Sequence, residues 1–265
     1  TSIVTVTVNP TVSDATISGP TTACIYGGFE EHLTTYTVAR AGACVFPANT
    51  SFLWTMPTGP VVGVIRSGQN TSTIVAEWHA TGGTNIGQIQ LAITLPPSHG
   101  GCVTNLTYNV TVYPQPQPVI TGPTQVCQNS TGSPVSTSIY TATLFVGDTY
   151  KWDVVGGTIT TPGGATGTGV VGNPSTITGV NGNSITVTWG TTPNPNATVT
   201  LTQTSVVGCI NRTTLNVNVN PTPNPVINGP GVVCDNAVAS YSTANNAPAN
   251  SYAWTVTSGN ATITA

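Results

Sequence analysis

The sequence predicts an all-β protein in which antiparallel β-sandwiches follow one another along the chain. Three observations lead to this prediction. The composition is rich in Thr, with 29 Gly and 21 Pro among 265 residues, and it is poor in the charged residues that favour helices. Apolar residues alternate with Thr or Asn in many short segments, as in half-buried strands. One group of motifs also recurs along the chain, which indicates tandem repeats.

Each repeat opens with an Ile-x-Gly-Pro motif and a Cys four residues after the Pro. The glycines of this motif, Gly19, Gly122 and Gly229, lie 103 and 107 residues apart. A Tyr follows in every repeat, and then an aromatic-x-Trp or a similar step. These positions are Tyr36, Tyr140 and Tyr241 for the tyrosines, and Trp54, Trp152 and Trp254 for the tryptophans. We expect the tryptophans to fill the space between two sheets, where each would bury roughly 150–250 Å².

The second half of the repeat ends in a closing strand. A second Trp, at Trp78 and Trp189, ends an alternating stretch, and a Gly-Cys step follows at Cys102 and Cys209. Strict alternation then runs to Pro114 in the first repeat and to Pro221 in the second. This spacing, with turn residues every 8–12 positions, predicts about seven strands in each sandwich.

The repeats divide the chain into four parts. The predicted parts are residues 1–10, the closing strand of a preceding repeat; 17–118 and 120–225, two complete repeats; and 227–265, the first part of a third. We expect an excerpt of a longer array. The alternative is that separate subunits polymerise by strand complementation, although a donated strand of about 10 residues would not replace what the third repeat lacks.

The junctions between repeats are rich in proline. Pro114, Pro116 and Pro118 alternate with Gln, and Pro221, Pro223 and Pro225 follow the same spacing. Such segments favour the extended polyproline II conformation and resist bending. We therefore predict a linear array with stiff connections.

Six cysteines without a Cys-x-x-Cys motif indicate disulfides and not a zinc site. The repeat predicts the pairs Cys24–Cys102 and Cys127–Cys209. Cys234 and Cys44 then have no partner in this window, and Cys44 lies in an insertion that only the first repeat contains. The alternatives for Cys44 are a free thiol, a different pairing within its repeat or an intermolecular link. Disulfides predict an oxidising, extracellular location.

Charge and composition exclude several functions. Four basic and seven acidic residues give a net charge of -3, so no basic surface is expected for nucleic acid or anionic lipid. No apolar run approaches the ~18 residues of a membrane-spanning helix, and no membrane insertion is predicted. The densest polar groups, Glu30-Glu31-His32 and Glu77-Trp78-His79, match no catalytic or metal-binding motif, and His99 and the Asp residues stand apart. We predict no catalytic, cofactor or metal site.

Two features of the sequence concern glycans. Eight Asn-x-Ser/Thr sequons are candidate attachment sites: Asn49, Asn70, Asn105, Asn109, Asn129, Asn196, Asn211 and Asn260. As a second hypothesis, the chain is a carbohydrate-binding module for surface glycans. This hypothesis requires exposed aromatic rings, for which Tyr26, Phe29 and Tyr113 are the candidates.

The motifs together resemble a known class of repeat. These are the I-x-G-P-x-x-x-C opening, Trp152-Asp153 followed by Val-Val-Gly-Gly, the I-T-V-T-W-G segment at Ile185, the Gly-Cys step and the N-V-N-V-N-P ending. They resemble the PKD-like/Ig-like tandem repeats of Bacteroidetes cell-surface proteins, such as gliding-motility adhesins exported by type IX secretion. The second Asp of the W-D-F-G-D-G core of PKD domains is replaced here, and the first repeat departs further, with Trp54-Thr-Met-Pro.

The resemblance implies an extracellular array without enzymatic activity. Our leading prediction is a structural segment of a large extracellular fibre or adhesin, forming a filament or stalk at the cell surface. The expected partners are neighbouring repeats of the same fibre and, under the second hypothesis, surface glycans. Repeats that contact mainly their neighbours give an array whose length scales with the number of copies.

Overall fold

The structure is a computed structural model that describes residues 12–27, 32–42, 44–129, 137–163, 175–223, 225–243, 251–259 and 261–264. The described chain is almost entirely β-structure, with one short 3-10 turn at Pro97–His99, which confirms the predicted fold class. The molecule divides into two compact units, Thr1–Asn220 and Pro221–Ala265, and each is described by itself. The strand predicted for residues 1–10 lies outside the described residues.

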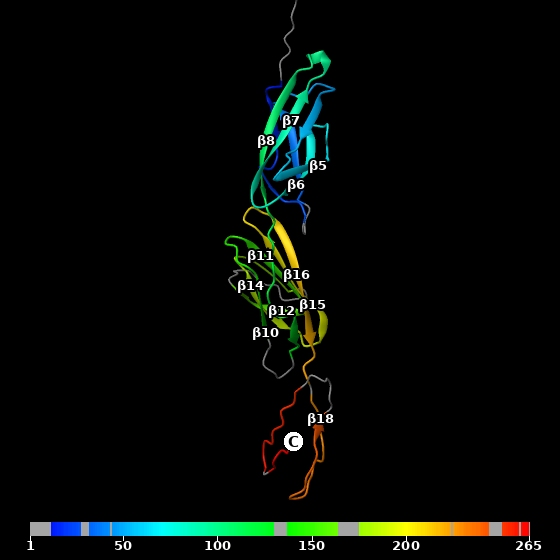
Figure 1. The fold of residues 1–265 in the computed structure, drawn as a ribbon, viewed down its shortest axis with the longest axis vertical. Helices are drawn as coiled ribbons and strands as arrows, with labels where there is room; N and C mark the ends of the chain where they lie inside the picture. Colours follow the sequence, from blue (N-terminus) through cyan, green and yellow to red (C-terminus); the bar gives the residue numbers. More distant parts are fainter. Residues whose placement is uncertain are drawn as a thin grey trace, which may run out of the picture. The chain divides into compact units, whose positions relative to one another are not determined.

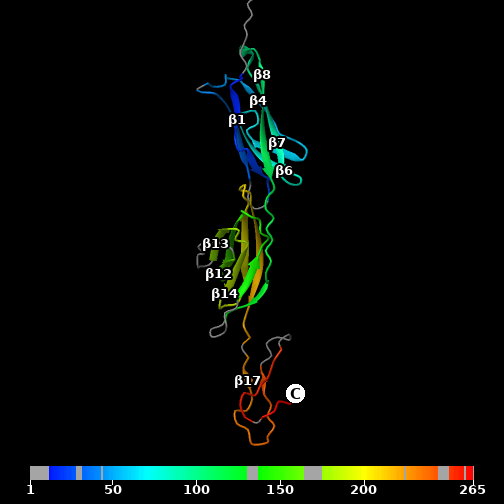
Figure 2. The same cartoon turned by 90° about the vertical axis from the view of Figure 1, so that its left-hand side faces the viewer.

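The first sandwich has two four-stranded sheets, which Figures 1 and 2 show from two sides. One sheet has the order β1-β3-β6-β5 and the other the order β2-β8-β7-β4. The strands are β1 (Ala15–Ser18), β2 (Thr22–Cys24), β3 (Thr34–Arg40), β4 (Ser51–Thr55), β5 (Val61–Ser67), β6 (Thr73–Ala80), β7 (Asn85–Thr94) and β8 (Val103–Tyr113). The short β2 runs parallel to the end of β8, whereas the other pairs are antiparallel.

The second sandwich repeats most of this plan, but the place of β1 holds only an isolated bridge between Thr121 and Thr141. A three-stranded sheet has the order β10-β14-β12, and a five-stranded sheet has the order β13-β11-β15-β16-β9. The strands are β9 (Gln125–Cys127), β10 (Thr137–Thr141), β11 (Thr149–Val155), β12 (Gly157–Gly163), β13 (Ser175–Val180), β14 (Ser184–Trp189), β15 (Asn194–Thr204) and β16 (Ile210–Asn220). Strand β13 extends the sheet beside β11 and has no described counterpart in the first sandwich.

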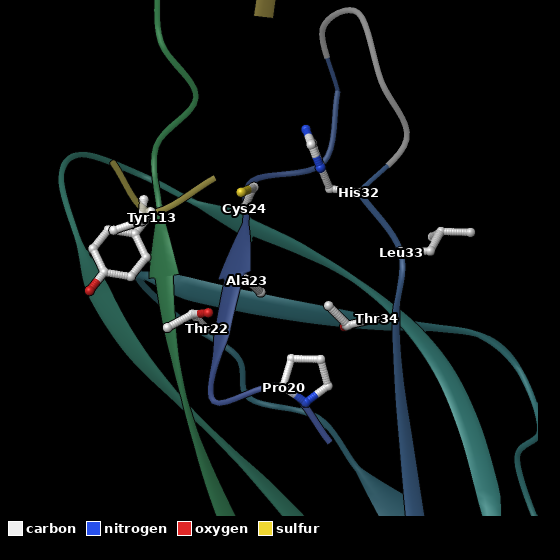
Figure 3. A pocket seen from close by; sticks show the side chains of 9 residues that line it. Pro20, Thr22, Ala23, Cys24, His32, Leu33, Thr34 and Tyr113 are labelled. Atoms are coloured by element: carbon white, nitrogen blue, oxygen red, sulfur yellow. The ribbon is translucent and has the colours of Figure 1, made fainter. Parts of the chain in front are cut away.

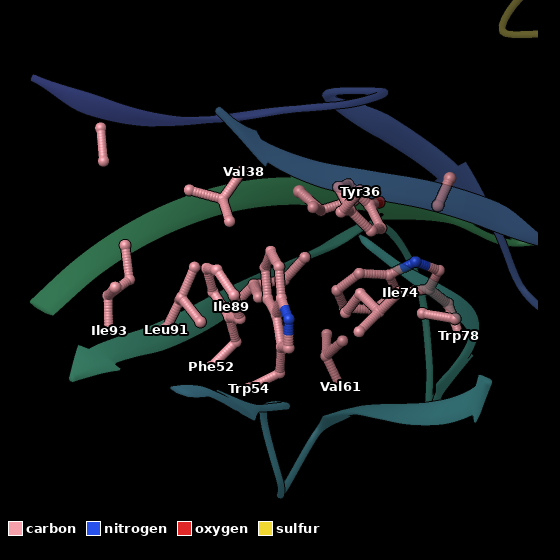
Figure 4. Close-up of a cluster of buried hydrophobic side chains, with 14 of the residues drawn as sticks. Tyr36, Val38, Phe52, Trp54, Val61, Ile74, Trp78, Ile89, Leu91 and Ile93 are labelled. Carbon is pink, nitrogen blue, oxygen red and sulfur yellow. The ribbon is translucent and has the colours of Figure 1, made fainter. Parts of the chain in front are cut away.

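Alternation along the strands builds the core. In β7, Ile89, Leu91 and Ile93 are fully buried between the sheets, where Figure 4 shows them beside the other core side chains. In β16, Val217 and Val219 are buried in the same way, whereas the alternate residues Asn216 and Asn218 are exposed and partly buried, respectively. The polar faces carry few charges because Thr and Asn occupy most positions that usually hold Lys or Glu.

The tryptophan prediction is right for both complete sandwiches. Trp54 is 2% exposed and Trp152 is 1% exposed, and each indole N–H donates to a backbone carbonyl: Trp54 Nε1 to Thr71 O at 2.8 Å and Trp152 Nε1 to Gly182 O at 2.7 Å. These hydrogen bonds satisfy the one polar group of each ring, which is the condition for burying it at low cost.

The Gly-Pro motif packs against the tyrosine that follows it. A Cβ on Gly122 would overlap the ring of Tyr140, and Gly19 lies equally close to Tyr36. The Tyr140 hydroxyl donates to Pro123 O at 2.9 Å. Only glycine permits this approach, which explains the Gly of the motif.

The unit Pro221–Ala265 forms part of the same pattern. Strands β17 (Ile227–Asn228) and β18 (Ser242–Thr243) pair, and Gly229 lies against Tyr241. However, Tyr241 is 49% exposed and Trp254 is 40% exposed. The expectation that every Trp of this motif fills a core therefore does not hold for Trp254.

Candidate functional site: a disulfide between consecutive sandwiches

Cys24 lies at one end of the first sandwich. Strand β2 pairs in parallel with the last residues of β8, with Cys24 opposite Tyr113. The Ile25 N–H donates to Tyr113 O at 2.9 Å and extends this pairing by one residue. Because β8 leads directly into the Pro-rich segment that begins at Pro114, Cys24 lies where the chain leaves the sandwich.

Cys209 lies in the turn of the β15–β16 hairpin of the second sandwich. Ser205 N–H donates to Cys209 O at 2.9 Å, and Cys209 N–H donates to Ser205 Oγ at 3.1 Å. Gly208 has a positive φ of 88°, a backbone conformation that glycine adopts without strain. These contacts define the backbone of the turn that carries Cys209.

The side chain of Asp148 stabilises this turn. Its carboxylate is buried and accepts from Gln203 Nε2 at 2.7 Å and from the Val206 N–H at 3.1 Å. Charge-assisted bonds of this kind are stronger than neutral ones. Asp148 stands apart from other acidic residues in the sequence, and its contact with the cysteine-bearing turn could not be predicted because 58 residues separate it from Val206.

A disulfide joins Cys24 to Cys209 and so connects the first sandwich to the second. The two Cα atoms lie 5.5 Å apart, and the bond spans 185 residues of sequence. That Cα separation is typical of protein disulfides. In the chain-entropy model, closing a loop of this length stabilises the folded state by about 5 kcal/mol.

The predicted pairs Cys24–Cys102 and Cys127–Cys209 are therefore wrong. Cys24 lies beside the last residue of β8, whereas Cys102 immediately precedes its first residue, and β8 is 11 residues long. At ~3.3 Å per residue these cysteines are separated by roughly 35 Å along the strand, far beyond the reach of a disulfide. The same holds for Cys127 and Cys209, which lie at opposite ends of β16.

The cysteines nevertheless occupy equivalent places in the two sandwiches. Cys127 is opposite Asn220 in the β9–β16 pair, as Cys24 is opposite Tyr113 in the β2–β8 pair. The Cys102 carbonyl accepts from Leu95 N–H at 2.9 Å, as the Cys209 carbonyl accepts from Ser205 N–H. Within the described chain, Cys44, Cys127 and Cys234 are exposed and form no disulfide.

Further contacts join the Pro-rich segment to its surroundings. Asn211 Nδ2 donates to Pro116 O at 2.9 Å, and Gln115 Nε2 donates to Gly27 O. Beside the disulfide lies a small pocket of about 170 Å³, which Figure 3 shows at close range. Its lining is mostly uncharged: Pro20, Thr22, Ala23, Cys24, His32, Leu33, Thr34, Tyr113 and Val207.

Tyr26, two residues after Cys24, belongs to a charged network. The buried Glu77 carboxylate accepts from Arg66 and from His79 Nε2, the latter at 2.9 Å. Burial opposes ionisation, but the hydrogen bonds from His79 and Arg66 outweigh it and hold the pKa of Glu77 below its usual value. The Tyr26 ring lies 5.4 Å from the Arg66 guanidinium and 5.8 Å from the His79 ring. The arrangement anchors the segment that follows Cys24.

The other candidate residues are dispersed. Among the described residues, no three His, Cys, Asp or Glu side chains come together as a metal site would require. Asp14 pairs with Arg40 at 3.1 Å, and this hydrogen bond lowers the pKa of the Asp14 carboxyl. Of the three aromatic rings considered for sugar binding, Tyr26 makes the contacts above, Tyr113 is partly buried and lines the pocket, and Phe29 lies outside the described residues, as do Glu30 and Glu31.

The sequons fall into two groups. Five of the asparagines are exposed: Asn49, Asn70, Asn105, Asn109 and Asn196. Asn129 and Asn211 are partly buried, and their amide nitrogens already donate to backbone carbonyls. Asn260 lies outside the described residues. Attachment of a glycan to any of them stays a prediction.

No described helix has the length and apolar character needed to cross a lipid bilayer.

Comparison with known proteins gives one match to a protein family. Residues 220–265 match the family model of the PKD-like domain. No curated protein sequence matches the chain.

The comparison with solved structures gives matches at low sequence identity. The adhesin InvE of Yersinia pseudotuberculosis is 13% identical, with a TM-score of 0.24 over 80% of this chain and 60% of that one. The cadherin-like domains 1 to 4 of zebrafish RET are 9% identical, with a TM-score of 0.19 over 66% of this chain and 41% of that one. A β-glucuronidase of Parabacteroides merdae is 11% identical, with a TM-score of 0.19 over 77% of this chain and 24% of that one.

Proposed function

We propose that this chain is a structural segment of a large extracellular fibre or adhesin, in which tandem sandwiches form a filament or stalk at the cell surface. The observation that carries the proposal is the covalent bond from Cys24 of one sandwich to Cys209 of the next. Disulfides persist in oxidising compartments outside the cytosol. A bond placed between sandwiches, and not inside one, strengthens a junction that already contains a Pro-rich connection.

Two further observations support a structural role without catalysis. The same Gly-Tyr contact and the same Trp positions recur in successive sandwiches, as expected for copies selected for stacking. The residues that chemistry would need are instead used in pairs that hold strands and turns, such as Asp148 with Gln203 and Glu77 with Arg66. On this proposal the partners are neighbouring repeats of the same fibre, and the PKD-like match at residues 220–265 extends the repeat beyond the second sandwich.

Immunogold electron microscopy of intact cells tests the proposal. Antibodies raised against the folded chain should label extended filaments outside the cell. They should bind without prior reduction of the disulfides. Labelling only after permeabilisation, or labelling of compact particles, would contradict the fibre role. The mass of the intact native polypeptide, measured without proteolysis, separates a long tandem array from short subunits that polymerise by strand complementation.

A further inference from the structure

We propose that the Cys24–Cys209 disulfide lets tension bypass most of both sandwiches, so that this part of the chain cannot be lengthened by unfolding. The inference deepens the proposed function, on which it rests for its biological setting. It depends only on which residues the bond joins and which strands lie on either side of it.

The bond closes a loop that contains most of the folded structure. A force applied to the two ends of the chain reaches Cys24, crosses the two sulfur atoms to Cys209 and continues toward the C-terminal end. Residues 25–208 lie inside the loop, so the force does not act across them. Strands β3 to β15 are all within that range.

The strands that remain in the path are already extended. Between Ala15 and Asn220 these are β1 (Ala15–Ser18) and β2 (Thr22–Cys24) on the first side, and β16 (Ile210–Asn220) on the second side. A strand rises about 3.3 Å per residue, and a fully stretched chain at most about 3.6 Å per residue. Pulling on these strands therefore gains little length even if their hydrogen bonds break.

Both sulfur atoms are attached to well-supported elements. Cys24 lies in the parallel pairing of β2 with β8, and the following residue, Ile25, donates to Tyr113 O. Cys209 lies in a turn whose backbone is held by Ser205 and by the buried Asp148 carboxylate. Strand β16 is paired on both sides, with β15 and with β9. Load thus enters and leaves each sandwich through hydrogen-bonded structure.

The chain inside the disulfide-closed loop is long enough for its extension to be measured. A separation of 185 residues corresponds to about 610–670 Å of extended chain at 3.3–3.6 Å per residue. With the disulfide intact, this length should be missing from the final extension. Without the disulfide, both sandwiches can unfold completely and release it.

Single-molecule force spectroscopy of the full chain, held by handles at its two ends, provides the test. The oxidised protein should reach a contour length about 610–670 Å shorter than the reduced protein. If dithiothreitol is added while the oxidised protein is held under constant force, it splits the bond into two thiols and becomes a cyclic disulfide itself. Lengthening that totals the same amount should then follow as the two sandwiches unfold.

Two variants make the test specific. The double variant Cys24→Ser/Cys209→Ser should extend fully without reductant, while Cys127→Ser, which removes an exposed cysteine outside the bond, should behave like the parent. Circular dichroism of each variant checks that the β-structure is retained. Equal contour lengths with and without reductant, or shortening that depends on Cys127, would overturn the inference. These outcomes concern the isolated chain and are independent of where the immunogold label falls.

Discussion

The second sandwich and the unit Pro221–Ala265 contain the same motif in two different states. In both, the motif glycine lies against the tyrosine ring, and the tyrosine hydroxyl donates to the carbonyl of the motif proline, at 2.9 Å for Tyr140 and 3.0 Å for Tyr241. Yet Tyr140 is fully buried and Tyr241 is 49% exposed. The contact between glycine and tyrosine therefore forms locally and does not need a core.

Burial of the tryptophan needs strands from much later in the sequence. Trp152 is paired across the sheet with Leu201 of β15 and with Ile177 of β13. In Pro221–Ala265 the described residues include no strand that could cover Trp254, which is 40% exposed. The contact between glycine and tyrosine therefore forms within a short stretch of chain, whereas burial of the tryptophan requires a complete sandwich.

The largest expected difference between the two regions comes from removing the tryptophan. Trp152→Ala would leave a cavity and an unused acceptor at Gly182 O, and should lower the free energy of unfolding by about 3–5 kcal/mol. The matched variant Trp254→Ala removes a side chain that is already 40% exposed. It should change the free energy of unfolding by at most about 0.5 kcal/mol. Chemical denaturation followed by circular dichroism measures both. Similar losses for both variants would show that Trp254 has a packed environment in solution.

The second difference concerns the glycine of the motif. Gly122→Ala places a methyl group in the ring of Tyr140, which the packed core prevents from moving, and should cost about 1–3 kcal/mol. Gly229→Ala meets the ring of Tyr241 in the same way, but that half-exposed ring can turn aside. Denaturation midpoints of the two variants should therefore differ, with Gly122→Ala the lower. An equal shift would mean that the ring position is fixed by the local motif alone.

Local patterns allowed much of the fold to be predicted from the sequence. The alternation in β7 and β16 identified buried faces, and the recurrence of Gly-Pro, Tyr and Trp identified equivalent places in successive sandwiches. These features depend on residues that are close in sequence or on a period that can be counted. The extra edge strand β13 was not expected, because the sequence does not specify which sheet an added strand will join.

The cysteine pairing could not be predicted for a related reason. The repeat shows that Cys24 and Cys127 are equivalent, and that Cys102 and Cys209 are equivalent and precede the closing strand. It does not show that Cys24 and Cys127 lie at the other end of that strand. The position of Cys24 depends on the parallel pairing of β2 with the end of β8. Strand β2 has only three residues, which is too short to show an alternating pattern in the sequence. Asp148 was missed for the same reason, since its partners Gln203 and Val206 are separated from it by more than 50 residues.

A smaller effect is expected from the tyrosine hydroxyl, and it depends on pH. Tyr140→Phe removes the bond to Pro123 O and should cost about 0.5–1.5 kcal/mol near pH 7. Burial raises the pKa of Tyr140 to about 12, against 10 for the free side chain. Because the pKa of Tyr140 is higher in the folded state than in the unfolded state, the protonated side chain stabilises the fold fully below pH 10. This contribution is lost as the pH rises toward about 12.

Denaturation at a series of pH values from 8 to about 12 checks this prediction. The parent should lose stability over that range more steeply than Tyr140→Phe. Part of the slope should remain in the variant, since burial also raises the pKa of Tyr36 and of Tyr150. Identical slopes for the parent and the variant would show that the Tyr140 hydroxyl reaches solvent. Tyr241→Phe, at the half-exposed site, should cost less near pH 7 than Tyr140→Phe.

The smallest effect should come from the charged pair that the second sandwich has and Pro221–Ala265 lacks. Lys151 Nζ lies 2.9 Å from Asp153 Oδ2 on the outer face of β11, and the equivalent positions in the later unit are Ala253 and Thr255. Lys151→Ala should change the free energy of unfolding by no more than about 0.5 kcal/mol, because exposed ion pairs contribute little. Asp153→Asn should cost more, since it also weakens the 2.6 Å bond from Thr176 Oγ1 on the neighbouring strand β13. If Lys151→Ala cost more than Asp153→Asn, the ion pair and not the contact with Thr176 would hold β13 at the edge of the sheet. The lack of that pair in Pro221–Ala265 would then explain part of the exposure of Trp254.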